Sequence, residues 1–166
     1  YNGSGKKVEG AITRGMDVSE WQGKINWKEA KKDLDFAFVR ISYGTRHLDD
    51  YYDYNMTEAE AADVPVGTYV YSLAKTNKEA LAEAQLAIRQ MQGHKVSYPV
   101  AFDLEDEATL GTLTRKEISQ IALTFCDEIR KAGYTPITIF ILAPGAFFVL
   151  ACLVAIQNKV RSEEHT

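Results

Sequence analysis

From Met16 to Phe140, short apolar runs alternate with longer stretches whose apolar residues recur every three or four positions. The short runs have the length and composition of buried strands, and the longer stretches have the period of helices. This alternation is typical of βα units around a parallel sheet. The predicted strands are Gly15–Val18, Phe36–Ile41, Val66–Tyr71, Tyr98–Phe102 and Thr135–Phe140.

Helices are predicted between these strands, near Trp27–Asp33, Tyr52–Ala62, Lys78–Gln92 and Arg115–Ala132. Thr114 is the expected N-cap of the last helix, because Glu117 follows three residues later and can complete a capping box. Gly133 lies just past the end of that helix, where a left-handed residue commonly stops the chain.

The repeats predict an α/β fold, namely an incomplete and irregular TIM-like β/α barrel. A Rossmann sheet is disfavoured because no Gly-x-Gly-x-x-Gly follows the first strand. A flavodoxin-like layering of the same units stays open as an alternative.

Composition and charge exclude several classes of partner. A chain of 166 residues with 46% hydrophobic content can bury one sizeable core, so we expect one domain and a monomer. The formal net charge is -4 and the cations are scattered singly, which excludes a nucleic-acid interface. Cys126 and Cys152 lack the spacing of a zinc or redox site, so we expect unpaired buried thiols and no metal.

A strand that ends in a cluster of acids is the strongest signal of chemistry. The segment Tyr98–Glu107 runs from an apolar strand directly into Asp103, Glu105 and two further acids. In an extended chain Asp103 and Glu105 share a face, about 7 Å apart, while the residue between them points into packing. Crowding raises the pKa of one carboxyl group, which gives the proton donor and ionised partner that glycoside cleavage requires. A solvated acidic turn or a helix cap is the alternative.

Asp17 closes the first predicted strand, where a barrel would point it at the same central cleft. Arg40 stands in an apolar strand, so we expect it to meet one of these acids or a substrate group, with an ordinary buried ion pair as the alternative. Flat aromatic faces beside carboxylates suit the stacking of sugar rings, although each could instead belong to the core. The aromatic candidates near strand ends are Trp21, Tyr43, Tyr69 and Tyr71.

Several pieces of sequence, taken in order, resemble one known family. They are Asp17-Val18-Ser19-x-Trp21-Gln22-Gly23-x-Ile25-x-Trp27, Phe36–Ile41 with Gly44-Thr45, Asp49 and Asn55, Val66-Gly67-x-Tyr69, Ala80 through Gln85, and Phe102-Asp103-x-Glu105. Together they resemble the glycoside hydrolase family 25 muramidases, also called lysozymes. The resemblance covers residues 14 to 140.

The resemblance implies an irregular β/α barrel that hydrolyses the β-1,4 bond between N-acetylmuramic acid and N-acetylglucosamine in bacterial cell walls. It implies no cofactor, peptidoglycan glycan strands as the partner, and an extracellular or wall-associated location. Glu105 corresponds to the general acid, and Asp103 and Asp17 correspond to acids that orient the substrate or stabilise positive charge. Whether a carboxylate or the sugar acetamide attacks stays open.

Both ends of the chain depart from the family pattern. Residues 1–13 are expected to be a linker, and residues 14–140 a catalytic domain that is incomplete at its C-terminus. The stretch from Ile137 to Ile156 is almost wholly apolar and precedes basic residues, so it is also a transmembrane candidate. Because it starts inside a predicted core strand, we expect residues 141–166 to be a chimeric or artefactual tail. The fragment is then expected to be weak or inactive, with a non-catalytic wall-binding or membrane-tethered module as the alternative.

Overall fold

The computed structural model describes residues 9–142 and 146–149, and within them a sheet of seven strands forms the scaffold. The strands follow the order β1-β2-β4-β5-β6-β7, with β3 paired to β2 outside this path. Neighbours from β1 to β6 are parallel, whereas β3 and β7 run antiparallel to their partners. Their bounds are β1 Gly15–Val18, β2 Phe36–Tyr43, β3 His47–Leu48, β4 Val66–Tyr71, β5 Val100–Leu104, β6 Pro136–Leu142 and β7 Ala146–Val149.

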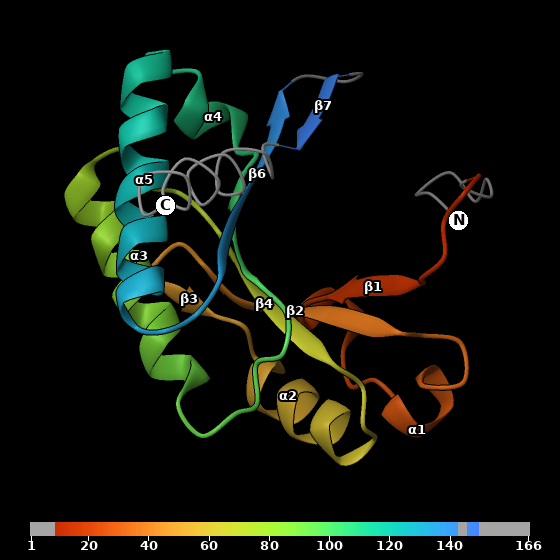
Figure 1. The fold of residues 1–166 in the computed structure, drawn as a ribbon. Helices are drawn as coiled ribbons and strands as arrows, with labels where there is room; N and C mark the ends of the chain where they lie inside the picture. Colours follow the sequence, from red (N-terminus) through yellow and green to blue (C-terminus); the bar gives the residue numbers. More distant parts are fainter. Residues whose placement is uncertain (1–8, 143–145, 150–166) are drawn as a thin grey trace, which may run out of the picture.

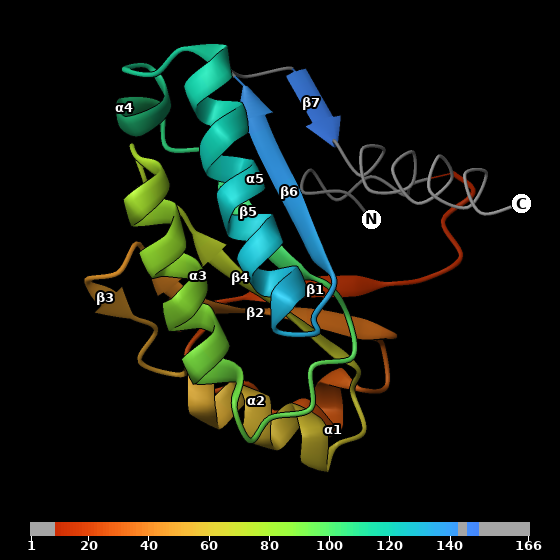
Figure 2. The same cartoon turned by 60° about the vertical axis from the view of Figure 1, so that its left-hand side comes forward.

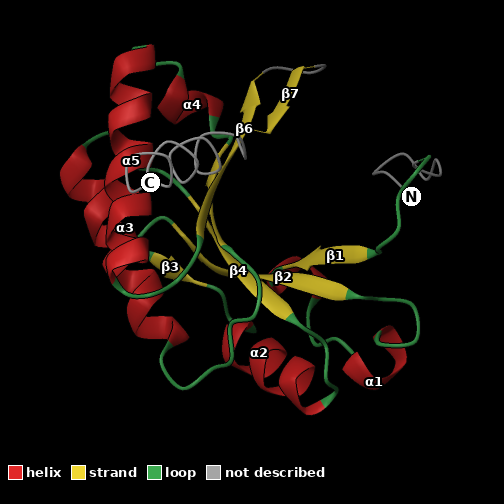
Figure 3. Ribbon diagram, viewed as in Figure 1, coloured by secondary structure: helices red, strands yellow, loops and turns green. Residues whose placement is uncertain are grey.

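Helices connect the parallel strands and lie on the outer side of the curved sheet (Figure 1). Figure 2 shows α3 and α5 packed side by side, and Figure 3 shows the helices gathered on one side of the strands. The helices are η1 Glu20–Gln22, α1 Trp27–Ala30, α2 Tyr52–Ala61, α3 Asn77–Met91, α4 Glu107–Leu110 and α5 Arg115–Lys131.

The start of α5 follows the sequence prediction closely. Thr114 accepts a hydrogen bond from the Glu117 backbone N–H, and the Glu117 side chain accepts one from the Thr114 backbone, which completes the capping box. Gly133, just past the helix, has a φ of 91°, a conformation that costs glycine little. These two signals therefore fix both ends of the helix that covers β5 and β6.

The hydrophobic core lies between the outer face of the sheet and the helices. Alternate strand residues point into it, so Val39, Ile41 and Leu104 are fully buried. Phe102 of β5 stacks on Phe125 of α5 with ring centroids 4.1 Å apart. The core thus holds the strands in register and leaves the opposite, inner face of the sheet for other contacts.

An aromatic cluster covers the amino-terminal half of the inner face. Phe36 stacks on Tyr98 with ring centroids 5.0 Å apart, and Phe38 meets both rings edge to face. Gly67 lies beneath it, where an added Cβ would come within 2.7 Å of the Pro99 carbonyl oxygen. The close approach of these segments therefore requires glycine at this position.

The strand order decides between the two predicted architectures. Strands from β1 to β6 neighbour one another in chain order apart from the short β3, as in a β/α barrel. A flavodoxin-like sheet would instead place its first strand inside the order and helices on both faces, so that alternative is wrong. Within the described residues, β1 and β7 end the sheet and the barrel is not closed.

Most predicted elements are present with shifted ends. The strands β1 and β4 have the predicted bounds, β2 extends to Tyr43, and β5 begins at Val100 instead of Tyr98. The short elements β3, α4 and β7 were not predicted. Cys126 is a free buried thiol, as expected.

The apolar C-terminal stretch forms strands as far as it is described, namely β6 and β7. None of the helices in residues 9–142 and 146–149 has the length and apolar character to cross a membrane. The predicted tail is otherwise outside the described residues, as are Cys152 and residues 1–8 of the predicted linker. The domain bounds stay a prediction.

Candidate active site

The carboxyl ends of the parallel strands gather the predicted acids and tyrosines along one edge of the sheet. Tyr71 at the end of β4 is the register partner of Asp103 on β5. Tyr69, two residues earlier, lies between Arg40 of β2 and Ala101 of β5. Because alternate residues share a face, Tyr69, Tyr71 and Asp103 all lie on the inner face.

Asp103 and Glu105 both have a raised pKa, and burial is the first cause in each case. Burial, together with the negative charges of Glu105 and Asp17, raises the pKa of Asp103 to about 7. The pKa of Glu105 is also raised, first by partial burial and then by Asp17. Asp103 Oδ1 is buried without a hydrogen-bond partner in the described part of the chain. Asp17, Asp103 and Glu105 thus form one coupled group of acids, in which the pKa of Asp103 is about 7.

Two tyrosine hydroxyls lie in the field of these acids. Burial raises the pKa of Tyr71 to about 12, with Glu105 and Asp106 as the next causes. Burial also raises the pKa of Tyr69, followed by the charge of Asp17. Both side chains therefore stay neutral at physiological pH and can donate hydrogen bonds beside the carboxylates.

The acid cluster after β5 serves two different purposes. Asp106 is the N-cap of α4 and its carboxylate accepts a hydrogen bond from the Thr109 N–H at 2.7 Å. Glu107 is exposed in the first turn of the same helix, where its charge suits the helix dipole. For these two residues the helix-cap interpretation is correct. Asp103 and Glu105 do not cap a helix, so they remain the candidates for catalysis.

Arg40 does not pair with any of the predicted catalytic acids. Its Nε donates to Asp49 Oδ2 at 3.0 Å, and its Nη2 lies 2.8 Å from Glu20 Oε1 without hydrogen-bond geometry. The expected pairing with an acid of the Asp17, Asp103 and Glu105 group is wrong. The carboxylates that contact the buried guanidinium and neutralise its charge are those of Asp49 and Glu20. The alternative of a buried ion pair is the one the structure contains.

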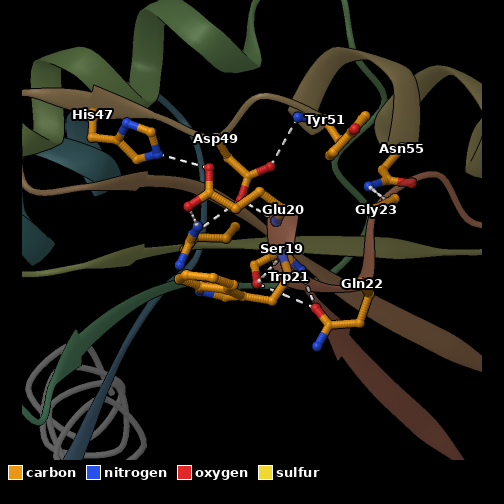
Figure 4. A network of polar contacts seen from close by, with 10 residues as sticks. Ser19, Glu20, Trp21, Gln22, Gly23, His47, Asp49, Tyr51 and Asn55 are labelled. Carbon is orange, nitrogen blue, oxygen red and sulfur yellow. Dashed lines mark hydrogen bonds and ion pairs between the residues drawn. The ribbon is translucent and has the colours of Figure 1, made fainter.

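Glu20 connects this ion pair to the loop that carries Trp21, as Figure 4 shows. His47 Nε2 lies 2.7 Å from Glu20 Oε2, and the Glu20 backbone N–H donates to Asp49 Oδ2 at 2.7 Å. The hydrogen bond from His47 lowers the pKa of Glu20, with Arg40 adding to the effect. Glu20 is therefore an ionised acceptor at neutral pH.

A cavity of about 400 Å³ adjoins the acid group through Tyr71, which lines it and is the register partner of Asp103. Tyr43 and Tyr71 stack with ring centroids 4.8 Å apart on one side of it, and Trp21 is 81% exposed. The lining residues are Glu20, Trp21, Arg40, Tyr43, His47 and Tyr71. Aromatic faces around a few charged groups suit a ligand with apolar ring faces and many hydroxyls, as a sugar has.

Metal ligation has no candidate in residues 9–142 and 146–149, where the acids, histidines and cysteines form no group of three that could hold an ion.

The match to a family model decides what kind of protein this is. Residues 16–142 match the family described as glycosyl hydrolases family 25. The chain belongs to this family. The predicted family resemblance is confirmed, and the matched segment contains all three acids, the cavity and the Arg40 ion pairs.

Sequence relatives of this family 25 chain include both a lysozyme and a protein without an assigned role. It is 38% identical to Lysozyme M1 of Streptomyces globisporus over 60 residues, which are 36% of this chain and 20% of the lysozyme. It is 27% identical over 152 residues to the uncharacterized protein YegX of Escherichia coli K12, covering 87% of this chain and 53% of YegX. The chain thus spans about half or less of these relatives.

Solved structures share its fold. A family 25 glycosyl hydrolase from Bacillus anthracis has a TM-score of 0.69 at 22% identity, over 81% of this chain and 63% of that one. The bacterial lysozyme of Streptomyces coelicolor has a TM-score of 0.65 at 22% identity, over 80% and 64% of the two chains. The family 25 chain is therefore an α/β protein with an incomplete, irregular TIM-like barrel, as predicted.

The predicted site residues fall into two adjoining groups. Asp17, Asp103, Glu105 and Tyr69 are coupled electrostatically, whereas Trp21, Arg40, Tyr43 and Tyr71 line the cavity. Sequence reasoning missed Glu20, Asp49 and His47 as parts of the site. Two signals in the sequence pointed to the acids among them. A buried arginine needs an acidic partner, and Asp49 belongs to the family pattern.

Proposed function

We propose that this chain is a muramidase domain that cleaves the β-1,4 bond between N-acetylmuramic acid and N-acetylglucosamine in bacterial peptidoglycan. The observation that carries the proposal is the coupled group of Asp17, Asp103 and Glu105 at the carboxyl edge of the sheet, beside an aromatic cavity. Membership of glycosyl hydrolases family 25 supports the reaction class. The related autolysin LytC of Streptococcus pneumoniae, with a TM-score of 0.69, was solved in complex with a synthetic peptidoglycan ligand.

In this proposal Glu105 is the general acid. Burial and the charge of Asp17 raise its pKa, which favours the protonated form that a general acid needs, and that proton passes to the glycosidic oxygen as the bond to the anomeric carbon breaks. Water then adds to the anomeric carbon and returns a proton to Glu105. Each turnover consumes one water and leaves a new reducing end.

Asp103 and Asp17 act on the positive charge that develops at the anomeric carbon. Asp103 is the more buried of the two, and its unpartnered Oδ1 is free to accept a hydrogen bond from the substrate acetamide. Either this carboxylate or the acetamide oxygen itself attacks, and both routes retain configuration. Asp17, exposed on β1, adds further negative charge to the group.

The cavity next to these acids holds the sugar rings. Trp21 and the stacked pair of Tyr43 and Tyr71 provide flat faces, and Arg40 with Tyr69 provides donors. A protein with this substrate works outside the cell or at the wall, and we expect it to act there as a monomer.

Glycan binding without cleavage is a second candidate. It is favoured by the sheet, which is not closed in the described residues and so leaves the β1 side of the acid group open. In this case the chain binds wall glycan with weak turnover or none.

Product analysis separates the two candidates. Purified sacculi are incubated with the chain, reduced with borohydride and analysed by mass spectrometry. The muramidase proposal predicts new reduced muramic-acid ends, whereas wall-binding predicts sedimentation with sacculi and no new ends. Reduced glucosamine ends would contradict the assigned bond.

A further inference from the structure

The loop that carries Trp21 forms most of its hydrogen bonds within itself, so a contact with another segment is needed to fix its position on the sheet. Ser19 and Gln22 form a capping box around the short helix η1, so most of its hydrogen bonds stay local. The Trp21 side chain is 81% exposed and has little packing to hold it. Whatever fixes the orientation of this indole must therefore act through the backbone or side chain of a neighbouring loop residue.

Glu20 supplies that anchor with both its backbone and its side chain. Its N–H donates to Asp49 Oδ2, and its two carboxylate oxygens reach Arg40 Nη2 and His47 Nε2 at 2.8 and 2.7 Å. The Glu20 side chain is only 18% exposed, and that of Asp49 is fully buried. Ion pairs at such depth are screened less than pairs on the surface.

We infer that Glu20 is a positioning residue, held by Arg40 and His47, that fixes Trp21 as a wall of the sugar-binding cavity. The inference rests on the proposed function, because it gives Trp21 a sugar to stack on. A ring already fixed in place loses less conformational entropy when the sugar binds. Glu20 thus acts on substrate affinity and not on the bond-breaking step.

Trp21 itself is the probe for the first test. The chain has two tryptophans, and Trp27 is buried at 2% exposure with its indole N–H donated to Asn55. Fast local rotation in the tryptophan anisotropy decay thus reports Trp21. Glu20→Gln keeps the size of the side chain but removes its charge and replaces one of its two acceptor oxygens by an NH2 donor. Glu29→Gln is the matched control, since Glu29 forms an exposed pair with Lys32.

The inference predicts a larger fast component in Glu20→Gln and no change in Glu29→Gln. Unchanged Trp21 rotation in Glu20→Gln, with circular dichroism like the wild type, would overturn the inference without any substrate being involved.

Affinity for a soluble N-acetylglucosamine–N-acetylmuramic acid tetrasaccharide is the second test. Glu20→Gln should weaken its Kd by roughly fivefold to tenfold, and any turnover should show a higher KM at unchanged kcat. If the wild type binds the tetrasaccharide and Glu20→Gln binds it with the same Kd, the inference is overturned. If the wild-type chain binds no glycan, that result contradicts the proposed function and, with it, the inferred stacking of a sugar on Trp21. The anisotropy measurement tests separately whether Glu20 fixes the orientation of Trp21.

Discussion

Tyr71 on β4 and Asp103 on β5 are register partners, so an aromatic wall of the cavity and the most strongly perturbed acid lie side by side on the inner face. The pairing follows from parallel strands whose carboxyl ends meet at one edge. Moving either strand by one residue would turn one of the two side chains into the core. The strand register thus joins the sugar cavity to the acid group.

Asp17→Asn should lower the pKa of both Asp103 and Glu105. The Asp17 carboxylate is a cause of the raised pKa of each, although burial is the larger cause for both. Removing one negative charge makes ionisation of the remaining two easier. Carboxyl ¹³C chemical shifts followed against pH measure the change.

Asp50→Asn is the control for that titration, because Asp50 is exposed and is not among the causes of either shift. It should leave both titration curves in place. Equal effects of the two substitutions would mean that net charge and not the local group sets the pKa of Asp103.

Glu83→Gln should make the free energy of unfolding less dependent on pH. Glu83 is buried in α3 beneath the Tyr71 strand, where burial raises its pKa to about 7 despite hydrogen bonds from Ser72 and the Leu73 N–H. Since the folded pKa exceeds the unfolded value, its stabilisation is complete below about pH 4.5 and is lost as pH rises through about 7. The wild type should lose about 2 to 3 kcal/mol relative to Glu83→Gln over this range.

Urea unfolding at pH 4.5, 6 and 8 measures this difference, and Glu58→Gln, an exposed change on α2, serves as the control. The control should follow the wild type at all three values. A constant offset between Glu83→Gln and the wild type would show that Glu83 does not titrate differently on folding.

Thr114→Ala should lower the free energy of unfolding by about 1 kcal/mol. Thr114 caps the helix that packs behind β5, and the substitution leaves the Glu117 N–H without its side-chain acceptor. Thr124→Ala is the matched control in the same helix, since its hydroxyl donates to the Gln120 carbonyl within the helix. Equal losses in urea denaturation would contradict the role of the cap.

The chain order of strands and helices could be predicted because it depends on local patterns. β1 and β4 are short apolar runs between clear turn residues, and the Thr114 cap has a recognisable spacing. β3 is too short to show the two-residue period of a strand. β7 lies inside a long apolar run, in which no such period can be recognised. α4 was hidden because its cap, Asp106, belongs to the same run of acids as Asp103.

The acids of the site were predictable from position, whereas their neighbours were not. Asp103 lies near the end of β5 and Glu105 directly after it, and the end of a buried parallel strand places both at the carboxyl edge. The partners of Arg40 come from η1 and from the segment after β3, at sequence distances of 20 and 9 residues. Only the folded sheet decides which acids reach a buried guanidinium, so Glu20, His47 and Asp49 were found in the structure.

Glu105→Gln compared with Glu107→Gln is the most direct test of the central claim. Both substitutions remove one negative charge from the same acid run, but Glu107 lies exposed in the first turn of α4. Release of reducing muramic-acid ends from sacculi is measured for both variants and the wild type. The account predicts a loss of roughly 100-fold or more in Glu105→Gln and near wild-type release in Glu107→Gln. Cleavage that persists in a folded Glu105→Gln variant would contradict it.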